Sequence, residues 1–289
     1  MLEMLVSLAV LLVVSGAAFS ALIYYQKSYG SEQLKADMHS SMRGAIELMT
    51  QEIGQAGCLN FAPRTLGAAV TASTSAQTVV LTSPTTVVLP SSAADIFVGE
   101  QLLVDTGAAQ ERVQVMNVLT SSITGVFKNN HLAGAPIAAV GVFPQGILSS
   151  STATQLKIFG DINADGKLVY VQYTCDTAAG TLTRSTTPIS AGAINPGQVL
   201  VQNLVPNPGG TACFQYASSV TSNGFTFVPS VAVTMTIQTS ERDPQTGQFV
   251  TMTKSFLKLA SRNILAGLSL AQANQTDSLQ PTPPGLPLH

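Results

Sequence analysis

The chain has 289 residues, enough for one large domain or two small ones. Its formal net charge is -2 and only 10% of its residues are charged, well below the usual share of about a quarter. Because the sequence has no basic stripe that could neutralise phosphates, a nucleic-acid partner is not expected.

The first 25 residues are predicted to form a membrane-spanning helix. From Leu2 to Tyr25 every residue is apolar or small except Glu3, and the next charged residue is Lys27. About twenty apolar residues are enough to cross the hydrocarbon of a bilayer, and no proline before Pro63 interrupts the run. A cleaved secretory signal would have a basic start and a core of about 7–15 residues, so it is not favoured. A simple membrane anchor explains the length but not Glu3.

Beyond Lys27 the pattern becomes that of an amphipathic helix over residues 26–53. Apolar residues recur at steps of three or four: Leu34, Met38, Met42, Ile46, Met49 and Ile53. The charged residues between them are expected on the water-facing sides: Glu32, Lys35, Asp37, Arg43, Glu47 and Glu52. The sequence therefore predicts one helix of about 53 residues, which is about 80 Å long and ends at Gly54 and Gly57. Its second half is expected to lie on a globular head.

The rest of the chain reads as two β-rich blocks. Runs of β-branched residues at 78–90, 101–105, 111–119 and 123–127 predict an insertion over 66–145, in the form of a small barrel. A second set predicts an antiparallel head over 146–267, with runs at 155–161, 167–175, 181–186, 198–205, 212–216, 230–240 and 249–260. The predicted fold class is therefore α+β. The segment 268–289 contains four prolines and no apolar periodicity, so it is predicted to be disordered.

Three cysteines leave few options for metal or nucleophile chemistry. Cys58, Cys175 and Cys213 form no C-x-x-C pair and have no histidine at metal-ligand spacing, so a zinc site is not expected. In an exported protein they predict one disulfide and one free thiol. Cys175 with Cys213 is the preferred pair because both lie in strand-like runs of the same region. Cys58 remains an alternative partner for either of them.

The N-terminal sequence LEMLVSLAVLLVV, followed by an amphipathic helix, resembles the start of type IV prepilin-like proteins. In that family a peptidase cuts after a basic leader that ends in glycine. The new N-terminus is methylated, and the fifth mature residue is glutamate. Glu3 matches that glutamate, and Leu2, Leu5 and Val6 match its flanks. Glu3 is third here and no leader precedes it, so we expect a start codon assigned too late, or a chain without its leader and first two mature residues.

The segment MTQEIGQAGCLNF (49–61), the long final hairpin and residues 261–263 resemble PilW-type minor pilins. The J-type minor pseudopilin of type II secretion has a related layout. The resemblance implies a pilin-like fold and a structural role, not an enzyme. It also implies insertion in the bacterial inner membrane with a periplasmic head, followed by a place in a pilus or pseudopilus. The implied partners are other minor pilins, the major pilin and the prepilin peptidase.

Glu3 is the residue to which the resemblance gives a role. A carboxylate inside a bilayer is unfavourable and is tolerated when it pairs with a cation. In the family, this glutamate faces the α-amine of the preceding subunit as helices stack in the filament core. Glu3 is therefore expected to set the register of assembly, with Leu2, Leu5 and Val6 packing beside it. The alternative is a glutamate at headgroup level with no such role.

The sequence carries one weak metal candidate. DINADG (161–166) places Asp161, Asn163 and Asp165 at the first, third and fifth positions of a calcium loop. The twelfth position holds Gln172 instead of glutamate, so a tight turn is favoured and calcium, if bound, would be bound weakly.

No other cofactor is predicted. No G-x-S-x-G, G-x-G-x-x-G or phosphate loop is present, and catalysis is not expected. A hypothesis of another class is a membrane-anchored β-domain adhesin or binding module.

Overall fold

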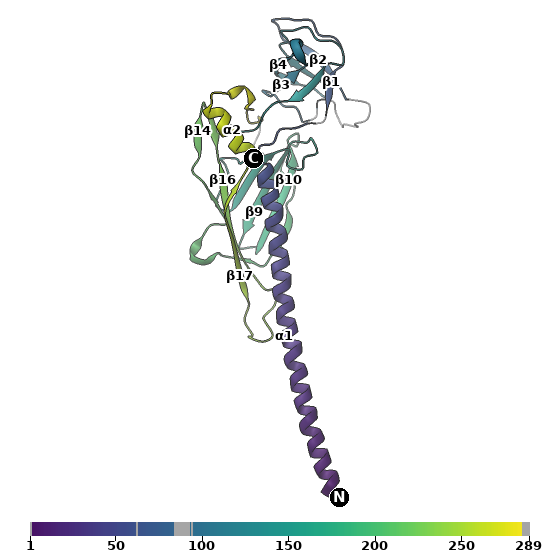
Figure 1. Ribbon diagram of the computed structural model, residues 1–289, viewed down its shortest axis with the longest axis vertical. Coiled ribbons are helices and arrows are strands. Elements are labelled where there is room, and N and C mark those ends of the chain that lie inside the picture. The colour runs from purple at the N-terminus through teal and green to yellow at the C-terminus, as the bar shows by residue number, and fades with distance from the viewer. Residues whose placement is uncertain (1, 62, 84–92, 94, 285–289) are drawn as a thin grey trace.

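The computed structural model describes residues 2–61, 63–83, 93 and 95–284. One long N-terminal helix, α1 (Leu2–Gln55), is followed by an antiparallel β-rich region, which confirms the α+β class. Figure 1 shows α1 as a stalk whose N-terminal end lies far from every strand. The helix is thus free over its first half and covered by the head over its second half.

Five residues of the predicted stripe are buried: Met38, Met42, Ile46, Met49 and Ile53. The other buried residues of α1 are Ser31, Ala45 and Glu52. Leu34 is the one member of the predicted stripe that is only half-buried. Glu52 was predicted on a water-facing side, and this is wrong: its side chain is buried because it bonds to strands of the head.

The helix ends where Gly57 turns into the left-handed region, with φ +77°. A β-carbon at this position would lie 2.7 Å from the carbonyl oxygen of Phe143, so glycine is required. The Gly57 amide donates to the carbonyl oxygen of Phe159 at 2.8 Å, and its own carbonyl accepts from the Phe143 amide at 2.9 Å. The chain therefore leaves the helix directly into contact with the head.

Two antiparallel sheets form the head. One has the order β11-β10-β9-β8, with strands Gln155–Gly160 (β8), Val169–Asp176 (β9), Thr181–Pro188 (β10) and Gln198–Gln202 (β11). In the other, β16 (Ser230–Gln238) pairs along its length with β17 (Thr251–Ala260). The opposite edge of β16 is shared by β12 (Leu204–Val205) and β13 (Phe214–Tyr216). A separate hairpin joins β14 (Val220–Ser222) to β15 (Phe225–Phe227).

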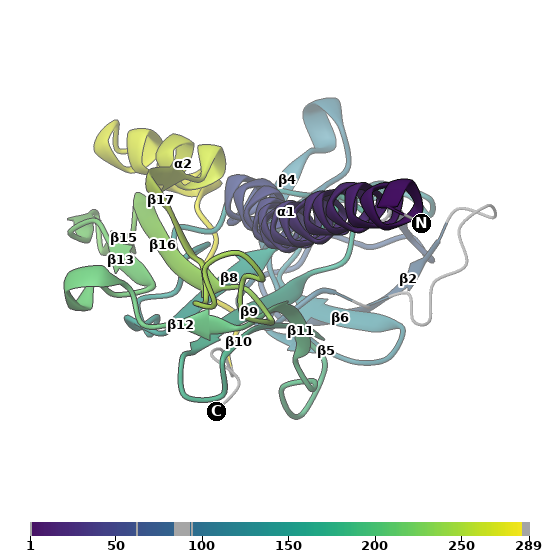
Figure 2. The ribbon, with the colours of Figure 1, turned by 90° about the horizontal axis from the view of Figure 1, so that it is seen from below.

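The second half of α1 packs on both sheets. Figure 2, seen along the helix, shows the strands of both sheets lying to one side of α1. The buried methionines and isoleucines of the helix form one hydrophobic cluster with Leu156 and Val171 of one sheet and Val233 and Met235 of the other. Burying this apolar stripe stabilises the second half of the helix, because packing of an amphipathic face supplies most of the stability of helices in proteins.

The block between α1 and the head is a curved seven-stranded sheet with its own core. Its order is β4-β3-β7-β1-β2-β6-β5, with strands Arg64–Leu66 (β1), Gln77–Thr82 (β2), Gln101–Val104 (β3), Glu111–Gln114 (β4), Asn117–Val118 (β5), Ser122–Gly125 (β6) and Pro136–Ala139 (β7). Only Val115 and Met116 separate β4 from β5 in the chain, yet β4 pairs with β3 and β5 with β6. The sheet therefore curls round its own hydrophobic cluster, as a small barrel does. Most of the second half of the predicted run 78–90 lies outside the described residues.

The prediction of disorder for 268–289 is wrong for 268–284. Helix α2 (Arg262–Gln272) is followed by a 3-10 turn (Thr276–Ser278). Leu279 and Gln280 are buried. The Gln280 amide donates to the carbonyl oxygen of Val142 at 3.0 Å, and its side-chain amide donates to that of Gln101 at 2.8 Å. These contacts hold the tail between head and barrel, whereas residues 285–289 lie outside the described part.

Candidate functional site

The N-terminal half of α1 is an exposed apolar surface. From Leu2 to Tyr25 every side chain is exposed except that of Ser15, which is half-buried. The most apolar 18-residue window has a mean hydropathy of 2.4, and none of it is buried. The first buried residue is Ser31, so about 43 Å of helix projects from the head. By length and composition this helix could anchor the chain in a membrane.

Glu3 lies in the first turn of this surface. Among the described residues its carboxylate has no hydrogen bond or ion pair, and its backbone carbonyl accepts from the Ser7 hydroxyl at 2.9 Å. Leu2, Leu5 and Val6 are 78%, 65% and 57% exposed, and their spacing of three and four places them on one side of the helix. The structure thus presents the four predicted interaction residues as one free surface. Any packing partner would have to satisfy the carboxylate.

The other end of α1 is held by a polar cluster, the helix anchor, made of Glu52, Tyr173 on β9 and Arg184 on β10. The Arg184 Nε lies 3.1 Å from both Glu52 carboxylate oxygens, and its Nη2 contacts Oε1. The Tyr173 hydroxyl donates to Oε2. Burial raises the pKa of Tyr173, and the Glu52 charge adds to the shift. Burial lowers the pKa of Arg184, but the hydrogen bonds to Glu52 outweigh it, so the net shift is upward.

Residues 261–263, part of the sequence resemblance, close the end of α1. The Ser261 hydroxyl donates to the carbonyl oxygen of Ala56, and its oxygen accepts from the Ile264 amide at 3.3 Å as the N-cap of α2. The side-chain amide of Asn263 donates to the carbonyl oxygen of Gln55 at 3.2 Å. Carbonyls at the end of a helix lack partners within it, so the two side chains supply hydrogen bonds that the helix itself does not. Helix position and head position are therefore coupled.

The disulfide joins Cys175 to Cys213, the preferred pair, with their Cα atoms 6.5 Å apart. Cys175 is on β9, and Cys213 directly precedes β13, so the bond connects the two sheets that carry α1. Cys58 is free and half-buried. Burial raises the pKa of its thiol, and the nearby Asp161 charge raises it further. The free thiol is thus kept protonated.

The DINADG segment forms a self-contained turn. The Asp161 carboxylate accepts from the backbone amides of Asp165 and Gly166, at 3.0 and 3.2 Å. Asp165 accepts from the Lys167 amide at 3.1 Å. Gln172 lies on β9, where its oxygen accepts from the Tyr170 hydroxyl. The carboxylates of Asp161 and Asp165 thus accept hydrogen bonds from the turn itself. The described residues contain no group of three or more His, Cys, Asp or Glu side chains that could hold a metal ion.

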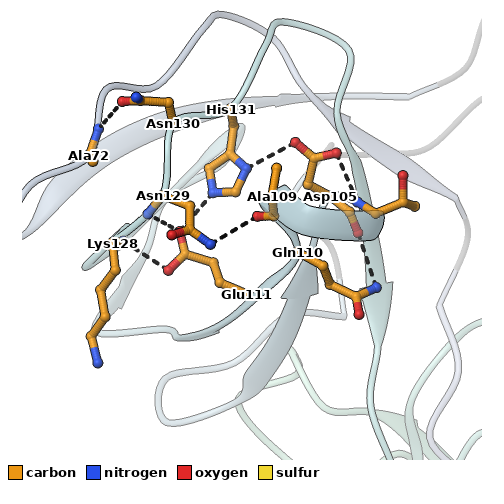
Figure 3. A network of polar contacts seen from close by, with 10 residues as sticks. Ala72, Asp105, Ala109, Gln110, Glu111, Lys128, Asn129, Asn130 and His131 are labelled. Carbon is orange, nitrogen blue, oxygen red and sulfur yellow. Dashed lines mark hydrogen bonds and ion pairs between the residues drawn. The ribbon is translucent and has the colours of Figure 1, made fainter.

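The barrel contains a charged cluster that sequence reasoning missed. Figure 3 shows His131 between two carboxylates, with Nδ1 3.0 Å from Asp105 and Nε2 2.7 Å from Glu111. Glu111 also accepts from the backbone amides of Lys128 and Asn129, at 2.8 and 3.0 Å. Each ring nitrogen thus has a carboxylate oxygen as its partner, so the ring is held on both sides. The partners lie 26 and 20 residues away in the chain, so no local pattern announces them.

Comparison with family models, with curated proteins and with solved structures found no match to this chain. The candidate site is therefore judged from its own geometry. That geometry is an exposed apolar helix with one carboxylate at its tip, rigidly joined to a β-rich head.

Proposed function

We propose that this chain is a PilW-like minor pilin, a structural subunit that primes or caps the tip of a type IV pilus. The observation that carries the proposal is the free half of α1. A helix that needed only to anchor a head would be served by apolar residues alone, whereas this one retains Glu3 within an otherwise uncharged surface. A retained carboxylate in such a setting indicates a use.

In this proposal the apolar surface has two successive partners. Residues 2–25 first lie in the inner membrane with the head in the periplasm, and then pack against the helices of other minor pilins and the major pilin. Glu3 pairs with the α-amine of the preceding subunit, which fixes the register. Leu2, Leu5 and Val6 supply the packing beside that pair. The helix anchor, and the hydrogen bonds from Ser261 and Asn263 to the end of α1, then fix the orientation of the head relative to the helix.

The test is removal of the Glu3 charge in the producing bacterium. Glu3→Gln should lower the amount of this chain in sheared filaments, and the number of filaments, more than about tenfold, because the amine of the neighbouring subunit loses its counter-charge. Glu32→Gln is the matched control, since Glu32 is an exposed glutamate of the same helix that pairs with Lys35. Membrane fractionation checks that both variants are still inserted. Unchanged filament incorporation of Glu3→Gln would overturn the proposal.

Processing provides a separate check. The proposal expects a leader that ends in glycine three residues before Met1, and a methylated mature N-terminus that makes Glu3 the fifth residue. Mass spectrometry of the chain purified from membranes reads both. A mature chain with an unmodified N-terminus at Met1 would contradict the prepilin assignment.

Two alternatives remain to be tested beside this one. A minor pseudopilin of type II secretion would use the same helix residues, and loss of the chain would stop export of secreted proteins instead of pilus formation. A membrane-anchored adhesin or binding module is favoured by the separate barrel at the end of the molecule far from the N-terminus (Figure 1). For that module, Glu3→Gln should leave display of the head and its binding unchanged.

A further inference from the structure

Strand β17 is a long strand with one free edge. It pairs with β16 over its whole length, from Thr251 opposite Gln238 to Ala260 opposite Ser230. Within the described residues, the backbone of 251–260 makes no hydrogen bond other than those to β16. The other edge therefore presents a row of unpaired amide and carbonyl groups, which is a template for a further strand.

A groove, here named the edge groove, runs beside this edge between β17 and α1. Its volume is about 850 Å³. Lys254 and Phe256 line its β17 side. Its helix side is lined by the buried Met42 and Ile46 and by six polar residues, namely His39, Ser40, Arg43, Glu47, Thr50 and Gln51. Thr253 and Ser255 point to the other face of the sheet, where their hydroxyls lie 2.8 Å from those of Thr236 and Thr234. An added strand would thus lie between the helix wall and the free edge.

The length of the free edge is limited by a bulge. The register of β16 shifts between Val231 and Val233. Two residues of β17, Leu257 and Lys258, therefore lie opposite the single residue Ala232. A bulge interrupts the ladder and stops edge pairing at that point. The usable edge is therefore Thr251–Phe256, about 20 Å of strand.

The charge of the edge indicates what kind of strand it takes. The sequence 249–260 contains two lysines and no acidic residue. Lys254 has no ion pair among the described residues, whereas Arg43 on the groove wall is already paired with Glu47 at 2.7 Å. Lys254 and Phe256 point the same way, two residues apart. A matching strand would place a carboxylate opposite Lys254 and an apolar side chain opposite Phe256.

We propose that the edge groove binds an extended acidic segment of a partner protein, which adds to β17 as a further strand. Backbone hydrogen bonds to Thr251–Phe256 would supply affinity, and the contacts of Lys254 and Phe256 would select the side chains. The site uses no residue of the N-terminal surface, so it does not depend on the proposed role of Glu3.

The probe is a dye-labelled peptide with capped ends and the seven-residue sequence Thr-Val-Thr-Glu-Thr-Val-Thr. Its binding to the full-length chain in detergent micelles is measured by fluorescence anisotropy. Two matched peptides carry lysine in place of glutamate, or N-methyl groups on the edge-facing amides. The glutamate peptide should bind about tenfold more tightly than the lysine peptide, and N-methylation should abolish binding.

A charge swap in the protein makes the test specific. Lys254→Glu should reverse the preference, so that the lysine peptide binds more tightly than the glutamate peptide. Lys128→Glu, which changes a lysine of the barrel, is the matched control and should change nothing, as should Glu3→Gln. Equal binding of the two peptides, binding that survives N-methylation, or no binding at millimolar peptide would overturn the proposal. Concentration-dependent dimers that are lost in Lys254→Glu would also overturn it, because the groove would then take a second copy of this chain.

Discussion

Arg184 donates to both carboxylate oxygens of Glu52, the last charged residue of α1, and thereby ties the end of the long helix to strand β10. The Glu52 side chain is only 5% exposed, so this ion pair forms where water is largely excluded. Two charges buried together are tolerated only when the geometry is good and the remaining lone pairs are used. The Tyr173 hydroxyl meets the second condition.

Removing one member of this pair should be strongly destabilising. Glu52→Gln leaves Arg184 without its counter-charge, and we expect the free energy of unfolding to fall by about 3 kcal/mol. Urea unfolding of the full chain in detergent measures this. The control is Glu47→Gln, because the pair of Glu47 with Arg43 is exposed and should contribute little to stability. Similar losses in the two variants would contradict the anchoring role.

The disulfide predicts a second measurable difference. Cys175 and Cys213 are 38 residues apart, and closing a loop of that size stabilises a fold by about 4 kcal/mol in the chain-entropy account. Cys175→Ser is therefore expected to lower the unfolding free energy by up to that amount, with Cys58→Ser changing it by less than about 1 kcal/mol. Peptide mapping without reduction should find the Cys175–Cys213 link. A link from Cys58 would contradict the structure.

Glu100 in the barrel predicts that stability depends on pH between about 4.5 and 8. Burial raises its pKa to about 8, well above the usual 4.5, although the Phe97 amide and the Arg64 charge act in the opposite direction. Between these two values the folded chain holds a proton that the unfolded chain has released. Stability should therefore fall as pH rises from 4.5 to 8. Glu100→Gln removes this dependence. The Tm of the unmodified chain should therefore fall relative to the Tm of Glu100→Gln as pH rises across that range. Parallel curves of Tm against pH for the two proteins would refute the raised pKa of Glu100.

The features that sequence reasoning predicted are those set by local periodicity. The stripe from Met38 to Ile53 has the spacing of a helix face, and the helix boundary follows from the glycines at its end. The two β blocks were separable because turn residues divide short β-branched runs. In each case the decisive information lies within a few residues.

The errors concern residues whose environment is set by distant parts of the chain. Glu52 reads as a water-facing residue until Arg184, 132 residues away, is placed beside it. Gln280 sits in a proline-rich segment, yet its side chain bonds to the backbone of Gln101, 179 residues away. Neither contact leaves a periodic signal in the sequence. Glu52 and Gln280 are buried because of tertiary hydrogen bonds, although the local sequence around each of them predicts exposure.

The His131 cluster predicts the response to acid. The hydrogen bond from His131 lowers the pKa of Asp105. Burial raises the pKa of Glu111, but the hydrogen bonds from His131 and two backbone amides outweigh it and lower it overall. Carboxyl groups with lowered pKa values contribute stability that is present above their ordinary values of 3.8 and 4.5 and is lost as pH falls below them.

His131→Gln should therefore act in two ways. It removes the ring whose nitrogens bond to both carboxylates, and we expect the free energy of unfolding at pH 7 to fall. Between about pH 5 and 3 its stability should fall less steeply than that of the unmodified chain, because the two carboxyl groups then titrate closer to their ordinary values. Any contribution of Glu100 is common to both proteins and cancels in the difference. His39→Gln, at an exposed position of α1, is the control. Equal acid slopes in His131→Gln and the unmodified chain would show that His131 does not hold this cluster together.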